Sequence, residues 1–150
     1  MGVTYKEMKD FEKAEACLSQ AVDLDKKLYW AHYNLGLILQ EKKNYAGALE
    51  QFQKAISPDW EYGRPHIGLA RIYNEHLNQP EQAVTEYEIA LQLEQRPFRL
   101  SKPLLGLARA REAAGRTAEA RQRYQEYLDR FPWGEHAPEA LAALERLGQA

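Results

Sequence analysis

A spacing of 34 residues recurs along this chain and sharply narrows the choice of folds. Met1, Leu35 and Leu69 are 34 residues apart, and Ala14 and Ala48 have the same spacing. A fixed period of this length is typical of arrays in which each repeat is one small unit that buries its apolar face only against its neighbours. The period therefore predicts a stack of similar units.

The period continues along the chain if two short insertions are allowed. One residue is added near 77–80 and three are added near 95–100. Three columns of equivalent positions then become visible: small residues, bulky residues four positions later, and aliphatic residues after those. The small column is Ala14, Ala48, Ala83 and Ala120, the bulky column is Leu18, Phe52, Tyr87 and Tyr124, and the aliphatic column is Val22, Ile56, Leu91 and Leu128.

Each repeat has the apolar spacing of short amphipathic helices. Ala48, Leu49, Phe52, Ala55 and Ile56 recur at helical spacing, and no segment of the sequence alternates apolar and polar residues as a strand would. Small residues let two helices approach closely, and bulky residues fill the space between neighbouring pairs. The sequence therefore predicts an all-α stack of antiparallel helix hairpins.

These columns resemble the tetratricopeptide repeat family, whose pattern is Trp-x2-Leu-Gly-x2-Tyr followed by Ala-x3-Phe, Ala and Pro. Gly36, Ala48 and Phe52 match that pattern, and the resemblance extends over roughly the whole chain. His32 stands where the family has Trp, and Arg111 stands where it has Tyr. The resemblance implies a right-handed α-solenoid with a C-terminal capping helix.

One repeat domain over residues 1–150 is the expected organisation. Because residue 1 falls at the seventh position of its repeat, the first helix is expected to be cut in half and the chain to be a piece of a longer array. Repeats are expected at about 1–28, 29–62, 63–100 and 101–134, with a capping helix at 137–148.

The boundaries of individual helices also follow from the sequence. Helices are predicted at 2–8, 11–25, 29–42 and 45–57. Proline is tolerated in the first turn of a helix, and Ser or Thr favours the position before it. We therefore expect Pro65, Pro80 and Pro103 in first turns and Ser101 and Thr117 as N-caps.

Composition argues against several classes of function. The formal net charge of −2 gives no general attraction for nucleic acid. No apolar run approaches the ~18 residues of a membrane span, so membrane insertion of this stretch is not expected. The single Cys17 cannot form an intramolecular disulfide and is predicted to be buried beside the small column. The sequence shows no secretory signal and leaves the compartment open.

No set of residues predicts catalysis, a cofactor or a metal. His32 and His66 are one repeat apart and could form a two-histidine metal site, but no carboxylate or cysteine completes the ligand set. Both are therefore expected to pack in place of the family's Trp. A glycine-rich phosphate loop and a nucleophile elbow are missing from the sequence. The chain is predicted not to be an enzyme.

The family resemblance implies that a partner binds in the concave groove lined by the first helix of each repeat. Five positions of that helix face the groove in the family. Carried onto this sequence, they are Trp30, Tyr33, Asn34, Leu37 and Gln40 in the second repeat, Arg64, Ile67, Gly68, Arg71 and Asn74 in the third, and Lys102, Leu105, Gly106, Arg109 and Glu112 in the fourth.

Two features of this set suggest a ligand. Arg64 and Arg71 on one helix, and Lys102 and Arg109 on the next, form basic pairs at helical spacing. The glycines among the groove positions are expected to leave room for a ligand backbone. A fitting ligand is an acidic segment with an apolar anchor, although the same arginines could simply be solvated.

Three functions remain open from the sequence. The first is a protein interaction scaffold that holds a peptide in the groove. The second is self-association through the truncated first repeat or the C-terminal helix. The third is a regulatory or substrate-presenting domain of a larger enzyme such as a glycosyltransferase. A clamp for a peptide C-terminal carboxylate is not expected, because Tyr33, Leu37 and Gly106 stand where the family's clamp has Lys, Asn and Arg.

Overall fold

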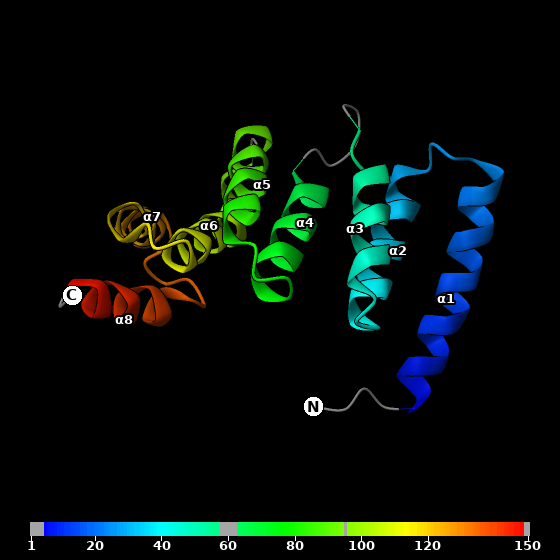
Figure 1. The fold of residues 1–150 in the computed structure, drawn as a ribbon, viewed down its shortest axis with the longest axis horizontal. Helices are drawn as coiled ribbons and strands as arrows, with labels where there is room; N and C mark the ends of the chain where they lie inside the picture. The colour runs from blue at the N-terminus through cyan, green and yellow to red at the C-terminus, as the bar shows by residue number, and fades with distance from the viewer. Residues whose placement is uncertain (1–4, 58–62, 95, 149–150) are drawn as a thin grey trace. The chain divides into compact units, whose positions relative to one another are not determined.

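The computed structural model describes residues 5–57, 63–94 and 96–148. These residues form eight α-helices, one short 3-10 helix and no strand (Figure 1), which confirms the all-α prediction. None of the helices in this described part of the chain is long and apolar enough to cross a membrane. The helices are α1 (Tyr5–Leu24), α2 (Tyr29–Glu41), α3 (Tyr45–Lys54), α4 (Arg64–Glu75), α5 (Pro80–Leu93), η1 (Pro97–Arg99), α6 (Ser101–Ala113), α7 (Thr117–Arg130) and α8 (Ala137–Gly148).

The chain forms two compact units, Met1–Gly68 and Leu69–Ala150. In the first unit α1 packs against α2, and α2 packs against α3. In the second unit α5 packs against α6, α6 against α7, and α7 against α8. Sequential packing of this kind is what a repeat array requires, while the prediction of one domain over 1–150 stays a prediction.

The bulky column and the glycines of the first unit fit one another. Phe52 of α3 is fully buried. A Cβ atom at Gly36 of α2 would lie 2.7 Å from Phe52 Cδ1, and one at Gly68 of α4 would lie 2.8 Å from Phe52 Cζ. The ring therefore packs directly on the backbone of two helices, and only glycine leaves the space that it occupies.

The core of the second unit continues the same columns. Tyr124 and Tyr127 of α7 are among the largest fully buried side chains. Partly buried Leu144 and Leu147 of α8 pack against this core. Its buried members are Leu104, Leu105, Ala108, Ala120, Tyr124, Tyr127, Ala140 and Ala143.

Helix starts agree with the sequence at the prolines and differ at two caps. Pro65, Pro80 and Pro103 lie in first turns, as predicted. Ser101 and Thr117 are wrong as N-caps, because each is the first residue inside its helix and the preceding residue occupies the cap position without a side-chain hydrogen bond. Before α6, the 3-10 helix η1 has already set a helical backbone, so the helix needs no separate cap.

Helix α1 runs without a break, although the sequence predicts separate helices at 2–8 and 11–25. Residues 2–4 lie outside the described residues. At the equivalent turn of the next repeat, Lys43 adopts a left-handed backbone with φ 60° and Asn44 caps α3. Lys9 lies instead inside α1. Only one turn of helix precedes Lys9 among the described residues, too short to bury a face, and straight continuation keeps its backbone hydrogen bonds.

Cys17 is exposed, so the prediction of a buried thiol is wrong. Helix α1 contacts α2 through Leu18 and Val22, which pack around Ala31 and Leu35. A hairpin partner would cover another side of α1, and α1 forms no hairpin within the described residues. The small column alone does not reveal which side of a helix is covered.

Candidate partner-binding surface

Helix α2 carries the aromatic end of the predicted groove. The Trp30 side chain is 46% exposed, and Tyr33 is half-buried one turn further along. Asn34 donates a hydrogen bond from Nδ2 to the backbone carbonyl of Trp30 at 2.7 Å, which holds its side chain on its own helix. Leu37 and Gln40 are half-buried. Helix α2 therefore offers a partner one large, accessible apolar side chain.

Arg64 of α4 and Tyr33 of α2 are brought together by the fold of the first unit. The guanidinium carbon of Arg64 lies 5.3 Å from the centroid of the Tyr33 ring. The Tyr33 ring lies 5.7 Å from the Phe52 ring, so a buried side chain supports it from behind. A cation over an aromatic face is attracted by the negative face of the ring. Arg64 is thus oriented while it remains exposed; Ile67 on the same helix is half-buried.

In the second unit, three charged side chains influence the pKa of Tyr87. Burial raises the pKa of Tyr87 to about 12; Glu75 adds to this rise, whereas Arg71 and Arg109 act in the opposite direction. The two predicted groove arginines of this unit therefore act on one hydroxyl group. The Oδ1 atom of Asn74 is buried and accepts no hydrogen bond from the described residues.

Arg109 of α6 is already bound by a carboxylate of α8. Its Nε donates to Glu139 Oε1 at 2.6 Å, and its Nη2 donates to the second oxygen of the same carboxylate. This bidentate contact holds the pKa of Glu139 below its ordinary value. Close by in the sequence, Glu112 accepts hydrogen bonds from the Tyr124 hydroxyl group at 2.8 Å and from Arg146 of α8.

Glu139 and Arg146 are not among the residues predicted for the surface, because α8 is predicted only as a cap. The 34-residue spacing is the signal that identifies them. It relates Leu105 to Glu139 and Glu112 to Arg146, so α8 continues the first-helix positions of the repeats.

Three predicted features of the groove differ in the structure. Gly68 and Gly106 leave no room for a ligand backbone, because the rings of Phe52 and Tyr87 fill the space beside them. Leu105 is only 2% exposed and lies in the core of the second unit. Gly68, Gly106 and Leu105 therefore serve the packing of helices against one another and do not line a binding groove.

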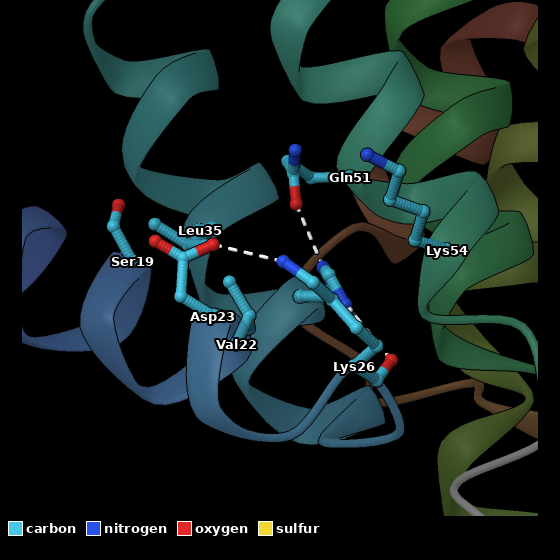
Figure 2. Close-up of a pocket in the computed structure, with 8 residues that line it drawn as sticks. Ser19, Val22, Asp23, Lys26, Leu35, Gln51 and Lys54 are labelled. Carbon is cyan, nitrogen blue, oxygen red and sulfur yellow. Dashed lines mark hydrogen bonds and ion pairs between the residues drawn. The ribbon is translucent and has the colours of Figure 1, made fainter.

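His32 occupies a packing and hydrogen-bonding position. A cavity of about 480 Å³ lies beside it between α1, α2 and α3 (Figure 2). Its Nδ1 lies 2.8 Å from Gln51 Oε1 and its Nε2 lies 3.3 Å from the backbone carbonyl of Lys26, so both ring nitrogens already face protein oxygens. His66 is also buried. No group of three or more potential metal ligands occurs among the described residues.

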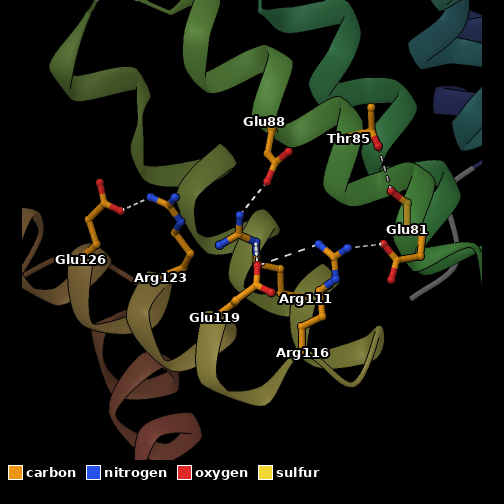
Figure 3. A network of polar contacts seen from close by, with 8 residues as sticks. All are labelled: Glu81, Thr85, Glu88, Arg111, Arg116, Glu119, Arg123 and Glu126. Carbon is orange, nitrogen blue, oxygen red and sulfur yellow. Dashed lines mark hydrogen bonds and ion pairs between the residues drawn. The ribbon is translucent and has the colours of Figure 1, made fainter.

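Arg111 joins three helices of the second unit (Figure 3). It is 7% exposed, and its Nη2 lies 2.6 Å from Glu88 of α5 while its Nε lies 3.5 Å from Glu119 of α7. Arg116 similarly reaches Glu81 of α5 at 3.1 Å. Arg111, which stands in place of the family's tyrosine, thus pairs with Glu88, and Arg116 pairs with Glu81, so the two arginines neutralise part of α5.

Comparison with known proteins agrees with this geometry. Family models described as "TPR repeat" and "Tetratricopeptide repeat" match residues 2–43, 31–57 and 104–132. No curated protein sequence matches the chain.

Two solved structures share the fold at low sequence identity. The crystal structure of YrrB, described as a TPR protein with an unusual peptide-binding site, matches with a TM-score of 0.77 and 20% identity over 95% of this chain and 70% of its own. The crystal structure of MamA protein matches with a TM-score of 0.73 and 21% identity over 89% of this chain and 70% of its own. The family models and the helical repeat together show that this chain is a tetratricopeptide repeat protein with an all-α solenoid fold.

Proposed function

We propose that this protein interaction scaffold binds an acidic, peptide-like segment of a partner, anchored by an apolar side chain. Tetratricopeptide repeats typically act as non-catalytic scaffolds for protein–protein interaction. The description of YrrB as having an unusual peptide-binding site makes a peptide the first class of ligand to test. The proposal gives the chain no catalytic step and no cofactor.

The observation that carries the proposal is the position of Arg64 over the ring of Tyr33. Tyr33 lies on α2, the helix that also exposes Trp30. Tryptophan, tyrosine and arginine are the residues most enriched where binding energy concentrates in interfaces. A guanidinium group can stack on an aromatic ring and also bind a carboxylate bidentately. A partner segment with Asp or Glu beside an aromatic or aliphatic residue fits this combination.

The residues of the second unit support the same chemistry. There Glu139 takes Arg109 in a bidentate contact, which is how a partner carboxylate would bind an arginine of this kind. A partner carboxylate would have to replace Glu139 to use Arg109. We therefore assign Arg71, Asn74 and Lys102 as the further contacts of this unit and leave out the buried Leu105.

Selection from a displayed library of random peptides tests the proposal. Peptides selected on the parent chain are expected to be enriched in Asp and Glu next to an apolar residue. Calorimetry then compares a selected peptide on the parent, Arg64→Glu and Trp30→Ala, with Arg121→Glu on α7 as a matched exposed arginine outside both surfaces.

We expect Arg64→Glu to weaken binding at least tenfold, or roughly 1.4 kcal/mol, and the Arg121→Glu control to bind like the parent. Added salt should weaken binding to the parent, because exposed charges are screened beyond about 8–10 Å at physiological ionic strength. Selected peptides that lack acidic residues, or that bind Arg64→Glu as tightly as the parent, contradict the proposal. Equal loss in Arg71→Glu with Arg109→Glu would move the assignment to the second unit.

A further inference from the structure

The cavity beside His32 in the first unit has the size and the lining of a site for a small organic molecule. Its volume of about 480 Å³ lies within the roughly 300–1,000 Å³ of typical ligand pockets, which combine apolar walls with a few polar groups. The buried side chains of Val22 on α1 and Leu35 on α2 supply apolar wall. The polar side chains that line it with His32 are Ser19, Asp23, Lys26, Gln51 and Lys54.

The residue at position 32 explains why this space is open. The family pattern has tryptophan at this position, and the imidazole ring of His32 is smaller than an indole ring. His32 is only 4% exposed and borders the cavity. The smaller side chain therefore leaves a space that an indole ring would partly fill.

His32 also holds two walls of the cavity in place. Its Nδ1 lies 2.8 Å from Gln51 Oε1 on α3, and its Nε2 lies 3.3 Å from the backbone carbonyl of Lys26. These contacts link α2 to α3 and to the connection between α1 and α2 that carries Lys26. Gln51 and the backbone of Lys26 are therefore positioned before a ligand arrives, which reduces the cost of ordering them on binding.

The two lysines at the cavity are paired with exposed carboxylates. Lys26 Nζ lies 2.8 Å from Asp23 Oδ1 (Figure 2), and these side chains are 72% and 75% exposed. Lys54 Nζ lies 2.5 Å from Glu50 Oε1, and these side chains are 50% and 60% exposed. Ion pairs as exposed as these contribute little to stability. The carboxylate of a ligand can therefore replace Asp23 or Glu50 at small cost.

We infer that this cavity binds a small organic acid that has one carboxylate and an apolar body. The apolar body packs on Val22 and Leu35, and the carboxylate accepts hydrogen bonds from the lysine ammonium groups. Asp23 lines the same cavity and repels a second negative charge, so inorganic phosphate fits less well. None of the residues that line the cavity belongs to the surface of the proposed function, so the two sites can be tested separately.

A chemical-shift titration of the isotope-labelled parent chain with sodium benzoate tests the inference. At pH 7 and constant ionic strength, benzoate should cause saturable shifts confined to the amides around the cavity. Benzyl alcohol has a similar apolar body without the charge, and inorganic phosphate has the charge without the apolar body. Each should bind more weakly than benzoate, by about threefold or more.

Substitutions at the rim test the charges. Asp23→Asn removes the competing partner of Lys26 and should strengthen benzoate binding by about twofold or more, a gain that a loss of folding cannot imitate. Lys26→Gln and Lys54→Gln should each weaken it by about threefold or more. Lys13→Gln is the matched control, because Lys13 is exposed on α1 and does not line the cavity, and it should bind benzoate like the parent.

His32→Trp tests the cavity itself. It restores the family residue and should abolish benzoate binding while the helical content stays unchanged. If this variant does not fold, the substitutions at Asp23, Lys26 and Lys54 still decide the matter.

Benzoate shifts that do not saturate, or that lie away from the cavity, overturn the inference. Binding of benzyl alcohol or phosphate as tight as that of benzoate overturns it too, as does a folded His32→Trp variant that binds like the parent. Arg64→Glu should leave benzoate binding unchanged. A loss of benzoate binding in that variant would place benzoate on the Tyr33 surface and refute the cavity site, whereas failure of the peptide selection would leave the cavity site standing.

Discussion

The ring of Tyr87 occupies the space that a side chain at Gly106 would need. A Cβ atom at Gly106 would lie 2.3 Å from Tyr87 Cζ and 2.4 Å from Cε1. The close approach of α5 and α6 therefore depends on this one glycine in the middle of α6.

Gly106→Ala is expected to lower the free energy of unfolding by about 1–3 kcal/mol, because the ring must move within a packed core. The loss should appear even though alanine is favoured over glycine inside a helix by roughly 1 kcal/mol. Chemical denaturation measures the change, and adding Tyr87→Leu should recover part of it. Gly148→Ala is the control, because its Cβ would be no closer than 3.8 Å to Arg121. A Gly106→Ala chain as stable as the parent would refute the contact.

The small column gives a second prediction. Ala48 and Ala83 are 0% exposed, so Ala→Leu at either position overpacks the core and should cost ~1–3 kcal/mol. Ala46 on the same helix as Ala48 is exposed, and Ala46→Leu should change stability by less than about 0.5 kcal/mol. If the thermal midpoint is the same for all three variants, the column assignment is wrong.

Two substitutions of Arg111 distinguish how much its ion pairs and its packing each contribute to stability. Its carboxylate partners Glu88 and Glu119 are 43% and 47% exposed, so both can be solvated when the arginine is removed. Arg111→Met keeps most of the buried stem and should change the free energy of unfolding by about 1 kcal/mol or less. Arg111→Ala loses the packing as well and should cost ~2 kcal/mol or more. Equal losses in the two variants, measured by urea unfolding, would show that charge pairing dominates.

The ion pair between Arg109 and Glu139 predicts that the stability of the protein depends on pH in the acid range. Arg109 lowers the folded-state pKa of Glu139, so the pair contributes stability above the ordinary carboxyl pKa of about 4.3. The contribution is lost as the pH falls through the lowered, folded-state pKa. Glu139→Gln should cost less than about 1 kcal/mol at pH 7, because both side chains are about 40% exposed.

The difference in stability between the parent and Glu139→Gln should shrink toward zero as the pH falls below about 4. Unfolding curves at several pH values measure it. Glu135→Gln is the control, since that side chain is 90% exposed. A difference that persists unchanged into acid would mean that the carboxylate contact with Arg109 does not carry the effect.

Much of the fold could be predicted because the residues that recur in each repeat are those that pack between helices. Ala48, Ala83 and Phe52 are buried as their columns predict. Helix α2 starts where predicted and ends one residue earlier, and α8 has the predicted bounds. The exposed Cys17 and the unbroken α1 could not be predicted, because both depend on whether a neighbouring helix is there to pack.

The candidate surface was predictable only in part. The position of a residue within its repeat predicts which side of the helix it lies on, but it does not predict which side chains contact it. Trp30 is exposed and Arg64 meets Tyr33, as a binding surface requires. The partner of Arg109 is Glu139, which lies 30 residues later in the sequence. Leu105 lies in the core of the second unit. Their assignment to partner binding stays a prediction.

The contacts of Phe52 with Gly68 and of Tyr87 with Gly106 each join one repeat to the next. A ring and the glycine that accommodates it therefore belong to different repeats. If recombination replaced the third repeat alone, Phe52 would meet a new neighbour and Gly106 would face a new ring. The repeats of this chain are consequently not interchangeable modules, and a viable exchange must carry the ring and its glycine together across the repeat boundary.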